Sequence, residues 1–106
     1  MITLTPAAAE QIRHSAKQSQ AEGLPLRIAA QRTPEGGIHY GMGFDDAERE
    51  GDSRFTSEGV ELVVAATSLP LVEGMTIDFV ELEPGRLEFI FLNPQDPNYK
   101  PAENEG

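Results

Sequence analysis

The sequence predicts a single-domain α+β fold with mostly antiparallel strands, one N-terminal helix, one short later helix and a flexible C-terminal tail. Helical spacing of apolar residues near the N-terminus changes at Leu26 to the apolar-polar alternation that is typical of strands. Turns rich in glycine and proline divide the alternating segments into hairpins. The length of 106 residues suits one domain, which we place at residues 1–93, with the tail at 94–106.

The N-terminal helix is expected to begin after Thr5, a capping residue, because Pro6 suits the first helical position. Its apolar residues share one face at helical spacing: Ala8, Ala9, Ile12 and Ala16. We expect Gly23 to end the helix. A stripe of small residues can lie close against a sheet, and the helix should gain its stability from that packing.

The first predicted hairpin follows this helix. Alternation over residues 26–31 and 38–44 predicts two antiparallel strands, joined by the Pro34 and Gly36-Gly37 turn. Gly41 and Gly43 interrupt the second strand and indicate a bulge or a close backbone approach. Because a strand follows Gly36-Gly37, the pair is not expected to form the phosphate-binding start of a helix.

Residues 45–52 contain five acids, one base and no apolar period, which indicates a solvated loop. Their carboxylates, at 45, 46, 48, 50 and 52, are only loosely spaced like a calcium loop. The closing glutamate and the flanking helices of such a loop are missing, so a solvated loop is favoured.

The second half of the chain predicts further strands. Residues 54–56 and 60–64 favour strands on either side of a Glu58-Gly59 turn. In residues 65–72, Ser68 is a candidate cap for one helical turn that Pro70 keeps short. Residues 75–80 and 86–92 alternate around Pro84-Gly85 and predict a second hairpin. After Asn93-Pro94 the prolines indicate a tail that leaves the fold.

Composition limits the possible functions. With 18 acidic and 8 basic side chains, the net charge of −10 disfavours direct nucleic-acid binding and favours a protein partner with a basic face. The alternative is that the charge only keeps the domain soluble. No apolar run is long enough to span a membrane and no signal peptide is evident, so we expect a soluble cytoplasmic protein.

No enzyme signature and no cofactor site is expected. The chain has no cysteine, so it offers neither a thiolate nucleophile nor a disulfide. No serine lies in a nucleophile-elbow pattern. His14, one turn after Glu10 on the helix, is expected to be a surface residue.

Several segments together resemble the A-type iron-sulfur carriers, the HesB/IscA/SufA family. They are residues 2–5 (ITLT) before an alanine-rich helix, 23–28 (GLPLRI), 68–79 (SLPLVEGMTIDF) and 91–94 (FLNP). The resemblance covers the whole expected domain and implies a fold of the HesB-like β-sandwich type. Within the family, the chain is most similar to a cysteine-free branch found with proteins of oxidative sulfur metabolism.

The resemblance also implies a lost ligand set. Family members hold a cluster through one cysteine in a glycine-rich turn and a Cys-x-Cys pair after Asn-Pro. Here the matching positions fall near Glu35, Lys100 and Ala102. A carboxylate and an amine are poor substitutes for soft thiolates, so we do not expect cluster transfer by the family's mechanism.

Three hypotheses remain open. The first is an adaptor that binds a protein in sulfur oxidation or iron-sulfur protein maturation. Its binding surface would comprise Glu35, Gly36, Gly37, His39 and Tyr40. The second is a carrier of iron(II) or zinc that uses Glu35, His39 and tail carboxylates, although a strand at 38–44 makes a solvent-facing His39 the favoured interpretation. The third is a regulator of gene expression that acts through a protein.

Overall fold

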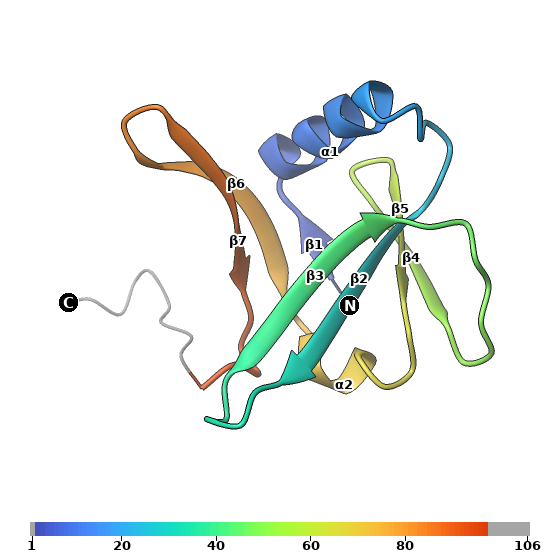
Figure 1. The fold of residues 1–106 in the computed structure, drawn as a ribbon, viewed down its shortest axis with the longest axis vertical. Helices are drawn as coiled ribbons and strands as arrows, with labels where there is room; N and C mark the ends of the chain where they lie inside the picture. Colours follow the sequence, from blue (N-terminus) through green and yellow to red (C-terminus); the bar gives the residue numbers. More distant parts are fainter. Residues whose placement is uncertain (1, 98–106) are drawn as a thin grey trace.

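The computed structural model describes residues 2–97 and contains two β-sheets, one longer helix and one helical turn (Figure 1). The helices are α1 (Pro6–Gln18) and α2 (Leu69–Val72). The first sheet has the order β1 (Thr3–Leu4), β6 (Thr76–Glu83), β7 (Arg86–Leu92). The second has the order β3 (Ile38–Phe44), β2 (Leu26–Arg32), β5 (Val60–Val64), β4 (Ser53–Ser57).

Antiparallel pairing predominates. The pairs β2–β3, β4–β5 and β6–β7 are antiparallel hairpins, whereas β1–β6 and β2–β5 are parallel. The α+β prediction with both hairpins and both helices is therefore confirmed. Neither helix in residues 2–97 has the length and apolar character needed to cross a membrane.

The core lies between α1 and the two sheets. Buried side chains come from every layer, among them Leu4, Ile12, Ile28, Leu62 and Ile77. The small residues of α1 are buried as predicted, because the helix packs on β1 and β6. Thr5 caps the helix by accepting a bond from the Ala8 amide (3.1 Å), and its hydroxyl donates to Asp78 on β6 (2.6 Å).

The prediction that Gly23 ends α1 is wrong. The helix ends at Gln18, and Gln20 takes a left-handed conformation (φ +56°). The Ala21 amide then donates to the Ala16 carbonyl (2.7 Å), which satisfies a carbonyl of the last turn. Gly23 instead occupies a later turn with φ +88°. The left-handed position after a helix is usually a glycine, so a glutamine there could not be recognised from the sequence.

The expected bulge in β3 is absent. Gly41 and Gly43 pair in register with Ala29 and Arg27, and a Cβ added to either glycine would meet nothing within 4 Å in the described chain. The register shift lies in the other hairpin, between Glu81 and Glu83 of β6.

The acidic segment 45–52 is not a freely solvated loop, because it folds around a cation on β2. Arg27 contacts Asp45 (Nε to Oδ2, 3.0 Å) and Asp52 (Nη2 to Oδ2, 2.8 Å), and it also donates to the Ala47 carbonyl. The Asp52 side chain is only 7% exposed. Sequence analysis missed this contact because Arg27 lies one hairpin earlier in the chain.

These bonds shift the titration of the carboxyls. Hydrogen bonds from Arg27 and from the Arg49 amide lower the pKa of Asp52 to about 2. The pKa of Asp45 is also lowered, chiefly by a hydrogen bond from the Ala47 amide and then by Arg27. The pKa of Arg27 is raised by its bond to Asp52.

Ser68 does not cap α2 with its side chain as expected. It is buried, and its hydroxyl accepts from the Ala30 amide (3.1 Å) and donates to the Ala30 carbonyl (3.2 Å). The hydroxyl therefore joins the start of α2 to β2. The pairing of β2 with β5 ends at Ile28, so the Ser68 hydroxyl takes the place of a strand partner for the backbone of Ala30.

Candidate functional site

The β2–β3 turn presents Glu35 at the surface. The Thr33 carbonyl accepts a bond from the Gly36 amide (2.9 Å), and the Thr33 hydroxyl accepts one from the Gly37 amide (3.0 Å). Gly36 has φ +94°, a conformation that favours glycine. Because the backbone and Thr33 satisfy the turn internally, the exposed carboxylate of Glu35 takes no part in holding it.

Tyr40 of β3 joins the two sheets. Its ring stacks on Phe91 of β7 with centroids 4.5 Å apart and planes 11° from parallel. Its hydroxyl donates to Asp96 Oδ2 (3.0 Å) and accepts from Asn93 Nδ2 (3.0 Å). Tyr40, Phe91, Asn93 and Asp96 form what we call the β3–β7 corner.

Asn93 is the buried polar centre of this corner. It is fully buried, and its Nδ2 also donates to the Leu71 carbonyl (2.7 Å) at α2. Its Oδ1 accepts a bond from the Gln95 amide (3.0 Å). One side chain thus ties together α2, β3 and the segment after β7, with its hydrogen-bonding capacity largely used.

The electrostatics of the corner keep the phenol protonated. Burial, with a further contribution from Asp96, raises the pKa of Tyr40 to about 12, although the bond from Asn93 acts in the opposite direction. At neutral pH the hydroxyl therefore remains a donor to Asp96. These bonds and the stacked rings make the corner a structural clamp between β3 and the segment after β7.

The clamp includes the segment that follows β7. Asp96 lies against Tyr40, and Gln95 donates to the Glu73 carbonyl (3.3 Å). Contacts thus extend past the boundary that we place at residue 93, which stays a prediction. The tail positions Lys100 and Ala102 lie outside the described residues.

The predicted partner-binding residues occupy one end of the β2–β3 hairpin. Glu35, Gly36 and Gly37 form its turn, and His39 and Tyr40 follow on β3. His39 is exposed, opposite Gln31, while its neighbour Tyr40 is half-buried, as the strand alternation predicts. The role of these residues in binding stays a prediction.

No group of three or more histidine, aspartate or glutamate side chains within residues 2–97 is arranged to hold a metal ion. Glu35 and His39 therefore find no third ligand in this part of the chain. His14 is exposed on α1, as expected for a surface residue.

Sequence analysis did not identify Phe91, Asn93 and Asp96 as parts of the site. An asparagine directly after an apolar strand and before a proline was the available signal, since a polar residue at that point is either a loop residue or a buried anchor. Its partners are 22 and 53 residues away, so only the fold distinguishes the two.

Comparison with known proteins gives the family of this chain. A family model described as iron-sulphur cluster biosynthesis matches residues 1–100. The chain belongs to this family. A Mycobacterium tuberculosis relative, protein Rv2204c, is 40% identical over 76% of this chain and 68% of its own length. The iron-sulfur cluster insertion protein ErpA of Klebsiella pneumoniae is 36% identical over 88% and 81%.

Solved structures of the family have the same fold. The crystal structure of IscA with a [2Fe-2S] cluster matches with a TM-score of 0.74 at 27% identity, covering 89% of this chain and 86% of that one. Escherichia coli SufA, involved in biosynthesis of iron-sulfur clusters, matches with a TM-score of 0.69 at 29% identity and the same coverage. The resemblance to the HesB/IscA/SufA family is therefore confirmed.

This chain departs from such carriers in its ligand chemistry. Iron-sulfur clusters in proteins are held mainly by thiolates, and this chain contains no cysteine. The turn where the resemblance places the first thiolate carries the carboxylate of Glu35. The donor set therefore does not fit a thiolate-ligated cluster as cargo.

Proposed function

We propose that this protein is a non-catalytic member of the family that binds another protein, in sulfur oxidation or in the maturation of iron-sulfur proteins, without carrying a cluster itself. The observation that carries the proposal is the β3–β7 corner. Tyr40, Asn93 and Asp96 hold the segment after β7 against β3, although the chain has no thiolate.

The clamp lies close to the hairpin turn. Asp96 is held beside Tyr40, which follows the turn by a few residues on β3. The same end of the hairpin presents the exposed Glu35 and His39 to a partner.

Charge suggests the chemistry of that partner. A net charge of −10 attracts a basic protein face over roughly a Debye length, and salt weakens the attraction. Membership of the cysteine-free branch associated with oxidative sulfur metabolism is part of the same proposal.

The test compares two charge-matched variants of the immobilised full chain at low and high salt. Glu35→Lys/His39→Ala alters the proposed surface, and Glu10→Lys/His14→Ala makes the same changes on exposed residues of α1. A protein captured from the native host by wild type and by the α1 variant, but not by the hairpin variant, is the expected result. Equal capture by both variants, or no capture at low salt, would refute the proposal.

A further inference from the structure

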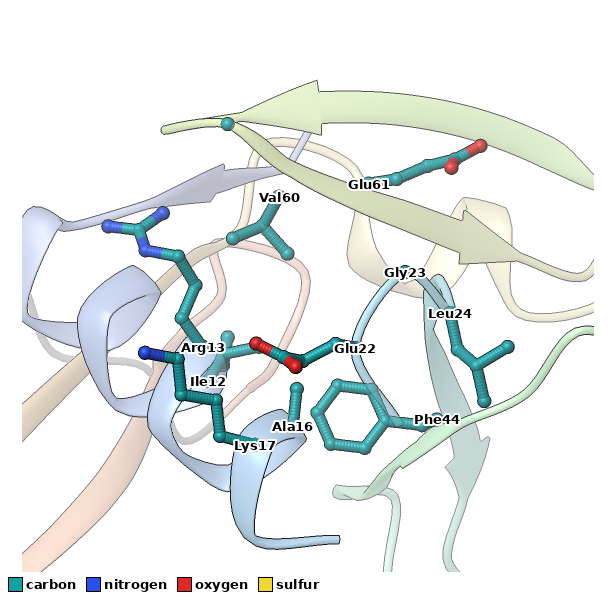
Figure 2. A pocket seen from close by; sticks show the side chains of 11 residues that line it. Ile12, Arg13, Ala16, Lys17, Glu22, Gly23, Leu24, Phe44, Val60 and Glu61 are labelled. Atoms are coloured by element: carbon teal, nitrogen blue, oxygen red, sulfur yellow. The ribbon is translucent and has the colours of Figure 1, made fainter. Parts of the chain in front are cut away.

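A cavity of about 390 Å³ lies between α1, the segment that precedes β2, and the β4–β5 turn (Figure 2). Its apolar lining consists of Ile12, Ala16, Leu24, Phe44 and Val60. Leu24 is 39% exposed, so its side chain is accessible from solvent at the edge of the cavity. A volume in this range is enough for a small organic ligand.

Two cations border this cavity without a carboxylate partner. Arg13 and Lys17 are one turn apart on α1, and neither forms an ion pair within residues 2–97. Arg13 only donates to the Glu58 carbonyl (2.7 Å). In contrast, four other cations are paired with acids: Arg27, Arg49, Arg54 and Arg86. Arg32 also lacks an ion pair within residues 2–97, but Arg13 and Lys17 place two unpaired cations side by side at this rim, in a chain of net charge −10.

Two acidic residues, Glu22 and Glu61, line the same cavity. Glu61 forms an ion pair with Arg54 (2.6 Å), so Glu22 is the acid of the lining that can offset the charge of Arg13 and Lys17. Figure 2 shows the nitrogen ends of Arg13 and Lys17 at one end of the cavity and Phe44 and Leu24 at the other. Glu22 lies between them with its carboxylate turned toward the cations.

We propose that this cavity binds a small amphipathic carboxylate, with its head at Arg13 and Lys17 and its apolar chain over Leu24 and Phe44. Charge-assisted bonds to the two cations select the anion, and burial of the chain supplies the remaining affinity. Glu22 stands near the place of the head, where its negative charge opposes binding. The site is separate from the β3–β7 corner, so it does not depend on the proposed function.

The experiment titrates the full chain, labelled for amide and methyl NMR, with octanoate, using octylammonium as the probe of opposite charge. Octanoate should produce saturable shifts at Ile12, Leu24 and Val60, and octylammonium should bind there at least several-fold more weakly. Absence of saturable shifts with octanoate, or equal binding of octylammonium, would overturn the proposal.

Variants test the assignment of each charge. Arg13→Gln/Lys17→Gln should weaken octanoate binding by about tenfold or more, the scale expected for charge-assisted bonds. Arg32→Gln/Arg86→Gln removes two positive charges outside the cavity and should leave octanoate binding nearly unchanged. Glu22→Gln should tighten binding. An equal loss in both double variants, or weaker binding after Glu22→Gln, would contradict the site.

Discussion

At the residue scale, the most consequential side chain is the buried Asn93. Its side chain forms hydrogen bonds with the Leu71 carbonyl, the Tyr40 hydroxyl and the Gln95 amide. The first two partners lie far from Asn93 in the sequence, and the third lies two residues after it. A buried amide is stable only when its partners are present, and its partners in turn depend on the amide. A single residue thus couples the segment after β7 to α2 and to β3.

Asn93→Ala should destabilise the protein by about 1–3 kcal/mol, because it leaves the Leu71 carbonyl without its donor. Urea unfolding measures the loss. Gln95→Ala, which removes an exposed side chain whose single bond is 3.3 Å long, is the control and should cost clearly less. Equal costs would show that Asn93 is not the centre of the corner.

The phenol of Tyr40 predicts a loss of stability at high pH. Its pKa is about 12 in the folded chain and about 10 when exposed, so the folded state holds the proton more tightly. This contribution is complete below pH 10 and is lost as the pH rises toward 12. Unfolding by urea at several alkaline pH values should show the decline, and Tyr40→Phe should lack it. A decline of the same size in both proteins would contradict the assignment.

At the element scale, the acidic segment behaves as a loop wound around Arg27. Its carboxylates gain hydrogen bonds from Arg27 and from backbone amides of the loop itself, at Ala47 and Arg49. A run of acids next to a strand cation can thus be ordered although its sequence is typical of a solvated loop. The contact links the outer side of β2 to the start of β4.

Arg27→Gln should raise the pKa of Asp52 from about 2 toward its ordinary value, because the mutation removes the largest cause of the shift. Carbon-detected NMR of the carboxyl groups measures it. In wild type, the stability from this low pKa is present above about pH 4 and is lost as the pH falls toward 2. Arg86→Gln, at an exposed ion pair, is the control and should leave the titration of Asp52 unchanged.

Sequence reasoning succeeded for elements whose signals are local. The Thr5 cap, the small-residue stripe of α1 and both hairpins follow from spacing and turn chemistry over a few residues. It failed where a distant group decides the outcome. Arg27 orders the acidic loop from a different part of the sequence. Gln20 follows α1 in a left-handed conformation that sequence analysis expects for glycine and not for glutamine.

The candidate site shows the same division. Sequence analysis identified the turn at Glu35 and the exposure of His39, since both depend on one hairpin. It missed the clamp of Tyr40 on Asn93 and Asp96, which requires two strands from different sheets to meet.

At the scale of the whole molecule, the chain keeps the fold of iron-sulfur carriers and lacks the thiolates that hold their cargo. Its corner still holds Asp96 beside β3 although no thiolate is present, so this part of the scaffold does not depend on the cluster ligands. If the scaffold is intact, restoring thiolates at the family positions should be sufficient to restore cluster binding.

The most direct measurement is anaerobic reconstitution with iron and sulfide, followed by iron and sulfide analysis and visible absorption spectra. It compares wild type with the triple variant Glu35→Cys/Lys100→Cys/Ala102→Cys. Our account predicts that wild type stays colourless and free of iron, while the variant acquires the brown colour and absorption of a cluster. Wild-type protein that holds iron and sulfide stoichiometrically would contradict it.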